Sequence, residues 1–208
     1  MEYGIDISAS DGKVDFKAVK DDGNNFVIIK AGSGFSTIDP LFESNYYSAK
    51  NAGLKVGAYW YSYAVTTSQA ITEAKACYEV INGKTFDYPI YIYMDEEGYK
   101  KLREIPNYGT LSIICEYFCM YLEANGYFTG VYASKKWFDT KLRNIQTIFD
   151  KWVASYDNDD YHVDKIRTAY RLHQYTTDYY LNGKYYSRNV VYDFNYPLII
   201  KKAHLNGL

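Results

Sequence analysis

The sequence predicts an α/β protein built as an irregular TIM-like (β/α) barrel with eight strands, in which helices follow mainly the first five strands. Two observations support this fold class. Short β-branched or aromatic segments alternate with helical segments along the chain, a pattern typical of a parallel sheet. Eight such strand segments within 208 residues favour a sheet that closes on itself. An open, doubly wound sheet is the alternative that the same alternation allows.

The expected strands are short segments rich in Val, Ile, Tyr and Trp. In chain order they are Gly4–Ser8, Phe26–Ala31, Val56–Ala64, Pro89–Glu97, Thr129–Ala133, Trp152–Tyr156, Tyr170–Thr176 and Val190–Asn195. We also expect Tyr179–Tyr186 to form a β-hairpin, because Asn182-Gly183 is a favoured two-residue turn.

The expected helices end at capping or turn residues. They are Phe42–Asn51, Ser68–Ile81, Gly109–Asn125 and Ser134–Leu142, with a short helical segment near Phe16–Val19. Ser68 suits an N-cap, and Asn125-Gly126 suits the C-terminal end of a helix. Between Trp152 and Asn195 there is little room for full helices, so we expect loops and the hairpin to join the last strands.

Composition and charge exclude several classes of protein. Hydrophobic residues make up 48% and charged residues 23%, which excludes a disordered chain. A net charge of −2 gives no reason to expect a nucleic acid partner, and no apolar stretch is long enough for membrane insertion. We expect one domain over residues 1–208, a monomer, with no appended cell-wall-binding module and no signal peptide.

Cysteine and tyrosine usage adds two expectations. Cys77, Cys115 and Cys119 lie in apolar helical patterns without further Cys or His at ligand spacing, so we expect buried, reduced thiols and no zinc site. Tyr accounts for 26 of the 208 residues. Tyr suits surfaces that are both apolar and wet, which include sugar-binding grooves, and the alternative is a generally Tyr-rich surface.

Acidic residues stand out against apolar ones near the ends of three expected strands. In Pro89–Glu97, side-chain alternation puts Asp95 and Glu97 on one face with Tyr91 and Tyr93, opposite an apolar face of Ile90, Ile92 and Met94. Asp6 and Asp193 show the same separation from apolar neighbours on the first and last strands. Since the first and last strands of a barrel are neighbours, we expect Asp6, Asp95, Glu97 and Asp193 to converge at the C-terminal rim.

Converging carboxylates suit glycosidic bond cleavage. Repulsion and desolvation raise the pKa of at least one of them, which leaves a proton donor beside ionised groups. Cleavage needs one carboxylic acid to protonate the leaving oxygen and a second carboxylate at the anomeric centre. A Mg²⁺ or Ca²⁺ site is the other chemical interpretation. Nearby tyrosines are candidate substrate-binding residues, namely Tyr59, Tyr61, Tyr132 and Tyr156, with barrel filling as the alternative for Tyr59.

Eight different short motifs follow one another in a fixed order along nearly the whole chain. They are Gly4–Ser8, Phe26–Gly32, Ala52–Ala64, Met94–Glu97, Gly130–Ser134, Trp152–Tyr156, His173–Tyr175 and Asp193–Asn195. In this order they resemble glycoside hydrolase family 25, the lysozymes of the Chalaropsis type. The resemblance implies hydrolysis of the β-1,4 bond between N-acetylmuramic acid and N-acetylglucosamine in bacterial peptidoglycan, without a metal or other cofactor. It also implies action at the bacterial cell wall by a secreted or phage-released protein.

The resemblance also assigns roles to residues. Glu97 matches the general acid, and Asp95 the group that stabilises the charged intermediate or orients the substrate's 2-acetamido group as an internal nucleophile. Asp6 and Asp193 match residues that position substrate or tune the central pair. A non-catalytic cell-wall sugar-binding domain on the same fold is the alternative function; it would not need the acids.

This chain departs from the family pattern at three places. The first strand continues into Ser8–Gly12 instead of a Trp-containing loop, and the Tyr-rich hairpin replaces a Gly-rich loop. His173 stands where a Trp commonly precedes Gln-Tyr. We expect His173 and Asn195 to contact substrate, with plain packing as the alternative for His173.

Overall fold

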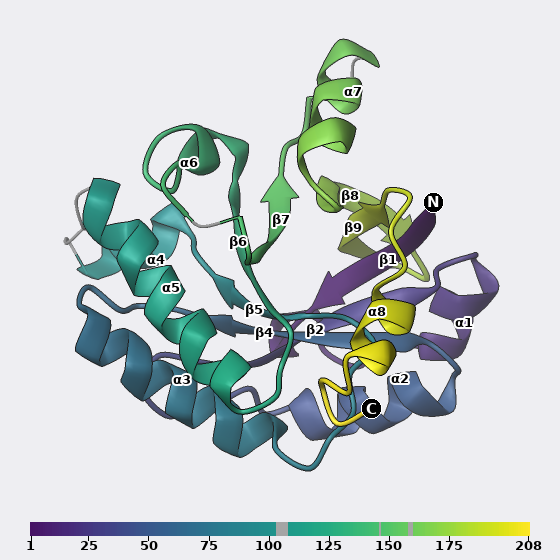
Figure 1. The fold of residues 1–208 in the computed structure, drawn as a ribbon. Helices are drawn as coiled ribbons and strands as arrows, with labels where there is room; N and C mark the ends of the chain where they lie inside the picture. Colours follow the sequence, from purple (N-terminus) through teal and green to yellow (C-terminus); the bar gives the residue numbers. More distant parts are fainter. Residues whose placement is uncertain (103–107, 146, 158–159) are drawn as a thin grey trace.

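Eight strands close into a barrel in the computed structural model, which describes residues 1–102, 108–145, 147–157 and 160–208 (Figure 1). In barrel order they are β1 (Glu2–Ile7), β2 (Phe26–Ser33), β4 (Lys55–Tyr61), β5 (Ile90–Tyr93), β6 (Thr129–Ser134), β7 (Asp150–Ala154), β8 (Leu172–Leu181) and β9 (Lys184–Val191). The pairing of β1 with both β2 and β9 closes the sheet, and the short β3 (Thr37–Ile38) pairs only with β2. The predicted α/β barrel is confirmed.

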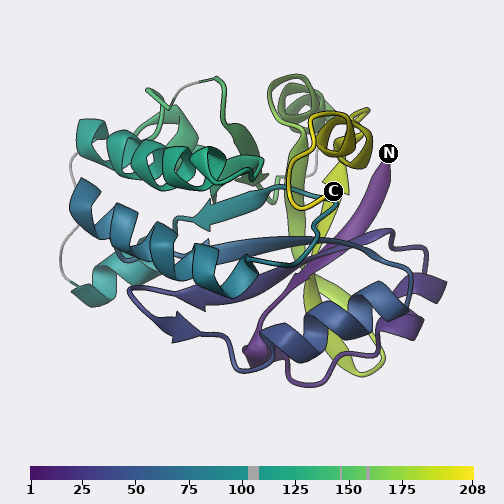
Figure 2. The same cartoon turned by 60° about the horizontal axis from the view of Figure 1, so that its bottom comes forward.

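Helices cover the outside of the barrel, and α3 and α5 lie side by side in both views (Figures 1 and 2). The helices are α1 (Phe16–Asp21), α2 (Phe42–Asn51), α3 (Thr67–Ile81), α4 (Glu96–Leu102), α5 (Tyr108–Ala124), α6 (Lys135–Asp139), α7 (Asp160–Ala169) and α8 (Tyr196–Lys202), and η1 (Ala9–Asp11) is a 3₁₀ turn. Among the described residues, none of these helices has both the length and the hydrophobicity that crossing a bilayer requires.

The helix α7, between β7 and β8, departs from the expectation that the last strands are joined mainly by loops and the hairpin. Ile166 is the one fully buried side chain in the part of α7 whose side chains the structure describes, residues 163–169. A helix that buries so little apolar surface leaves almost no periodic pattern in the sequence.

The hairpin between β8 and β9 determines which end of the barrel the last strand reaches. Asn182 and Gly183 both have positive φ angles, 49° and 80°, as a type I′ turn requires. The chain therefore reverses, and β9 runs antiparallel to both of its neighbours. Val191 at the end of β9 pairs with Glu2 at the start of β1, so the residues after β9 lie at the N-terminal end of β1.

Two apolar layers fill the protein, as the alternation in the strands predicts. Ile90, Ile92 and Met94 belong to the layer between barrel and helices, whereas Tyr91 faces the barrel interior. The interior is largely aromatic, with Phe26, Tyr59, Tyr88, Tyr91, Tyr132, Trp152 and Tyr196 among its members. A Cβ atom at Gly130 would lie only 2.6 Å from the Tyr91 ring, so glycine is needed on the neighbouring strand to admit it. Part of the high tyrosine content is therefore barrel filling.

The three cysteines are buried and unpaired, as expected. Burial raises the pKa of all three thiols, which keeps them protonated and unreactive in the folded protein.

Candidate active site

Asp95 lies at the carboxyl end of β5 and begins the next helix. The strand ends at Tyr93, and α4 starts at Glu96. Asp95 Oδ1 accepts the backbone N–H of Glu97 at 3.2 Å, which is the bond of an N-cap residue. The expectation that the strand continues to Glu97, with both acids on one strand face, is therefore wrong. Acidic residues are favoured in the first turn of a helix, so this sequence turns into a helix after Asp95.

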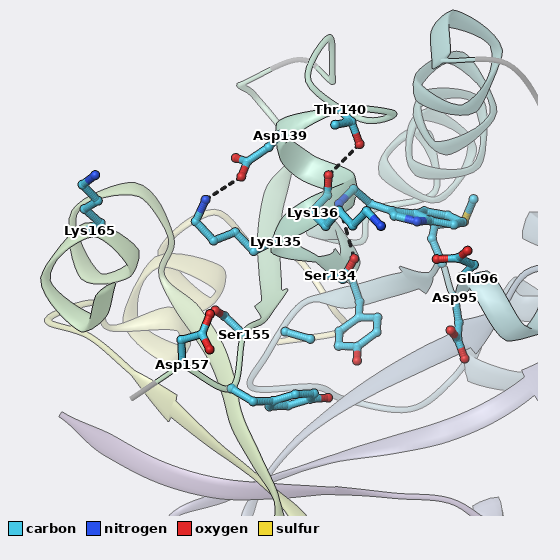
Figure 3. Close-up of a pocket in the computed structure, with 15 residues that line it drawn as sticks. Asp95, Glu96, Ser134, Lys135, Lys136, Asp139, Thr140, Ser155, Asp157 and Lys165 are labelled. Carbon is cyan, nitrogen blue, oxygen red and sulfur yellow. Dashed lines mark hydrogen bonds and ion pairs between the residues drawn. The ribbon is translucent and has the colours of Figure 1, made fainter. Parts of the chain in front are cut away.

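The helical turn exchanges the expected positions of the two glutamates. On a continuing strand Glu96 would point away from Asp95 and Glu97 as a solvated loop acid. Instead it lines the groove described below (Figure 3). Glu97 is exposed over 69% of its side chain and forms an ion pair with Lys100 at 2.9 Å. This pair is screened by solvent and restrains Glu97 weakly. Both acids thus lie on the first turn of α4, one residue apart, beside Asp95.

Asp6 faces the barrel interior near the carboxyl end of β1, while Ile5 and Ile7 face the outer layer as predicted. Its Oδ1 accepts hydrogen bonds from Gln174 Nε2 at 2.8 Å and from Asn189 Nδ2 at 2.7 Å. Burial raises the pKa of Asp6 to about 7, although the two hydrogen bonds oppose this shift. Asp6 can therefore hold or release a proton near neutral pH.

Gln174 connects Asp6 to two tyrosines of the groove. Its Oε1 accepts the hydroxyl of Tyr132 at 2.8 Å and that of Tyr156 at 2.7 Å. Asn189, the second donor to Asp6, accepts the indole N–H of Trp152 at 2.8 Å. Neither amide was predicted as a site residue. One sequence feature could have identified Gln174 as a site residue. It follows His173 directly on a strand, so the two side chains must point to opposite faces of the sheet.

Three tyrosines from adjacent strands stack beside these acids. Tyr61, Tyr93 and Tyr132 are neighbours in register on β4, β5 and β6, with ring centroids 5.2 Å and 3.8 Å apart. Tyr61 donates its hydroxyl to Asp95 Oδ2 at 3.0 Å. Burial, and after it the negative charges of Asp6 and Asp95, raise the pKa of Tyr93. The prediction that tyrosines and acids share this end of the barrel is confirmed for Tyr61 and Tyr132.

A groove of about 860 Å³ opens at this end of the barrel. Figure 3 shows Asp95 and Glu96 on one side of it and Lys135, Asp157 and Lys165 on the other. Tyr132 and the half-exposed Tyr156 also line it. Tyr59 does not reach the groove, because it is only 6% exposed and packs against Tyr93 inside the barrel. Its expected role in substrate binding is replaced by barrel filling.

Asp193 and Asn195 do not lie with the other candidates. The antiparallel course of β9 brings both to the opposite end of the barrel, beside Met1 and Glu2. Asp193 pairs there with Arg167, which holds the pKa of its carboxyl below the ordinary value. Asn195 caps α8 by accepting the N–H of Leu198 at 3.1 Å. The prediction that Asp193 converges with Asp6 and Asp95 is therefore wrong, and so is the prediction that Asn195 contacts substrate. Both assumed that the last strand ends at the same rim of the barrel as the other strands.

His173 is fully buried and has no access to a substrate. Its Nε2 lies 2.7 Å from the carbonyl oxygen of Ser155, and its Nδ1 lies 2.9 Å from the hydroxyl of Tyr192. A carbonyl only accepts, so Nε2 carries the hydrogen and Nδ1 accepts from Tyr192. Burial also lowers the pKa of His173, which favours this neutral form. Of the two interpretations of His173, packing is correct.

Asp6 makes a testable contribution to the pH dependence of stability. Its pKa is about 7 in the folded protein against an ordinary value of 3.8, so between these values the folded state binds more protons than the unfolded state. This term therefore lowers stability as pH rises from about 4 to about 7. In Asp6→Asn, Oδ1 still accepts from Gln174 and Asn189. At about pH 8 we expect the variant to melt at a higher temperature than the wild type, because the wild type loses unfolding free energy by ionising the buried Asp6. The difference should be about 2–4 °C for each kcal/mol of that loss, and it should vanish near pH 4. A melting difference that does not change with pH would contradict the assignment.

Gln174 should hold the site together. In Gln174→Leu, the hydrogen bonds to Asp6, Tyr132 and Tyr156 are lost, and the buried Tyr132 hydroxyl is left without its acceptor. We expect the free energy of unfolding in urea to fall by about 1–3 kcal/mol. The matched control is Tyr156→Phe, which removes one half-exposed donor and should cost about 0.5 kcal/mol. Equal losses in the two variants would show that the amide does not connect the site.

Together, the fold and the site define a class, the (β/α)-barrel proteins with an acidic, tyrosine-lined groove at the carboxyl ends of their strands, as in glycoside hydrolases. Within the described residues, no three His, Cys, Asp or Glu side chains are grouped so as to hold a metal ion. The chain belongs to glycosyl hydrolases family 25, which its sequence matches over residues 5–184.

Individual relatives agree with the family. The autolytic lysozyme of Clostridium acetobutylicum is 30% identical over 180 residues, which are 86% of this chain and 52% of that protein. The chain therefore spans about half the length of this relative. A family 25 glycosyl hydrolase from Bacillus anthracis has a TM-score of 0.78 at 20% identity, over 99% of this chain and 94% of that one. The modular autolysin LytC from Streptococcus pneumoniae, in complex with a synthetic peptidoglycan ligand, has a TM-score of 0.79 at 24% identity. The match covers 92% of this chain and 46% of that one. These two structures share the fold.

Proposed function

We propose that this protein is a muramidase that hydrolyses the β-1,4 bond between N-acetylmuramic acid and N-acetylglucosamine in bacterial peptidoglycan. The observation that carries the proposal is the groove at the carboxyl ends of the strands, where Asp95 and Glu96 lie beside stacked tyrosines and Glu97 adjoins them on the first turn of α4. Family membership and the lysozyme name of a relative support the choice of substrate. The site of action would be the bacterial cell wall, reached by secretion or by release from a phage-infected cell.

In the proposed reaction, Glu97 donates its proton to the leaving glycosidic oxygen as the bond to the anomeric carbon breaks. Positive charge grows on that carbon. The carboxylate of Asp95 either stabilises this charge directly or orients the 2-acetamido group, which then attacks as an internal nucleophile. A water molecule completes hydrolysis and returns a proton to Glu97. Asp6, held by two amides, would position the sugar and tune the charge near Asp95.

The exposure of Glu97 is compatible with this role. Catalytic hydrogen bonds are often long or unformed until substrate binds, and Glu97 is free of packing over most of its side chain. Its weak ion pair with Lys100 would be exchanged for contact with the substrate oxygen.

Digestion of purified peptidoglycan with mass analysis of the products tests the function. We expect new N-acetylmuramic acid reducing ends, formed equally well with and without a chelator. New N-acetylglucosamine reducing ends would mean that the other glycosidic bond is cleaved. A protein that sediments with cell walls but releases no reducing ends would be the sugar-binding domain instead.

A further inference from the structure

Two tyrosines stand exposed at the tip of the β8–β9 hairpin. Tyr180 is 61% exposed and Tyr185 is 64% exposed, so both rings are accessible from solvent. They are a cross-strand pair in register, with ring centroids 5.1 Å apart. The exposed residues around them are polar, among them Asp178 and Asn182. The tip therefore presents two aromatic rings within a polar surrounding.

The hairpin that carries this pair is attached firmly to the barrel. Lys184 Nζ donates to the carbonyl oxygens of Asp11 at 2.6 Å and Lys13 at 2.8 Å. Tyr179 donates its hydroxyl to Asp22 and accepts from Asn24 Nδ2 at 3.1 Å. Together with the type I′ turn, these bonds fix the hairpin backbone that carries the two rings, which lowers the entropic cost of binding.

The pair lies on the same face of the sheet as the partners of Asp6. Along β9, Asn189 and Val191 face the barrel interior, whereas Tyr186 and Val190 face the outer layer. Tyr185 is four residues from Asn189 on the same strand, so its side chain points to the same, inward face. Tyr180 is paired directly opposite Tyr185 and therefore shares that face. Four residues at about 3.3 Å each put Tyr185 about 13 Å beyond Asn189 along the strand. The hairpin rises from the same end of the barrel as the groove, since Ser187 pairs with Asp6.

We propose that Tyr180 and Tyr185 form a stacking platform for a further sugar ring of the glycan strand, extending the catalytic groove along the hairpin. This inference rests on the proposed function, because its ligand is the glycan strand proposed for the groove, and the hairpin rises from the same end of the barrel as that groove. A phenol ring offers an apolar face to the C–H groups of a pyranose and a hydroxyl to its polar edge. Two rings in a polar surrounding are a small area for a lipid surface or a second copy of the chain, which need larger apolar patches.

The test is binding of purified glycan strands, stripped of stem peptides and sorted by length, to the whole protein. We expect Tyr180→Ala/Tyr185→Ala to bind long strands about threefold to tenfold more weakly and to lose the preference for long over short strands. Tyr180→Phe/Tyr185→Phe keeps the rings and should retain most of the affinity. The matched control is Tyr47→Ala, which removes a tyrosine of similar exposure (57%) on α2 and should bind as the wild type does.

The outcomes separate this inference from the proposed function. If the double alanine variant keeps the wild-type preference for long strands, the platform is refuted, while reducing-end release by the wild type still supports the muramidase. Suppose instead that the wild type releases no reducing ends, but the double alanine variant binds long strands more weakly than the wild type does. The proposed function then fails and the platform stands. A variant altered only in vesicle binding or in self-association would overturn the platform in favour of a lipid or protein contact.

Discussion

Glu97→Gln should lower the release of new reducing ends from peptidoglycan by about 10²–10⁴-fold, because an amide cannot supply the proton that the leaving oxygen needs. The variant should fold and bind cell walls normally. Glu97 is exposed over most of its side chain, and the bond that fixes the start of α4 uses its backbone N–H, which the substitution keeps. Thermal unfolding and wall sedimentation would check the fold and the binding, and reducing-end analysis would check the chemistry.

The chain provides an unusually close control in Glu96→Gln. Glu96 lies one residue away on the same turn of α4, is also an acid, and lines the groove. We expect this variant to keep most of the wild-type rate. If Glu96→Gln were inactive and Glu97→Gln active, the proton donor would be Glu96, and the assignment made from the family motif would be wrong. Near-normal rates in both variants would remove the acids of α4 from the mechanism altogether.

The sequence predicts the barrel well because strand alternation records burial on two different sides. Ile90, Ile92 and Met94 pack under the helices, and Tyr91 fills the interior, as their spacing indicates. The direction of the last strand was not predicted correctly, although the hairpin was. A two-residue turn reverses the chain, so an expected hairpin before β9 already implies that Asp193 ends at the other rim.

The site is predictable where one strand position decides it and unpredictable where cross-strand contacts decide it. Asp6 follows from alternation within β1. Gln174 and Asn189 become site residues only because the register of β8, β9 and β1 brings both amides to one carboxylate oxygen. Residue spacing within a single segment contains no information on that register.

Three groups of tyrosines in this protein have different physical roles. Some, such as Tyr59, fill the barrel, others stack beside the acids, and Tyr180 and Tyr185 stand exposed at the hairpin tip. Composition alone does not distinguish these groups, because each exploits the same combination of an apolar ring and a polar hydroxyl.

Asp95→Asn should reduce turnover of peptidoglycan by about 10²–10³-fold, since it removes the negative charge proposed to stabilise the anomeric carbon while changing little else. Asn is as good an N-cap as Asp, so α4 should still begin at Glu96 with its N–H bond from Glu97 intact. The loss should therefore appear in kcat, with thermal stability nearly unchanged.

The companion variant Tyr61→Phe separates the charge of Asp95 from its orientation. Tyr61 donates to Asp95 Oδ2, so its loss leaves the carboxylate charged but held only through Oδ1. We expect a fall in kcat of about tenfold to a hundredfold, because a hydrogen bond to a charged carboxylate contributes about 1.5–3 kcal/mol. If Asp95→Asn turned over peptidoglycan at the rate of Tyr61→Phe, charge at Asp95 would not be what stabilises the transition state. A loss confined to Asp95→Asn and Glu97→Gln would instead identify the start of α4, where one backbone bond joins the two residues, as the catalytic centre.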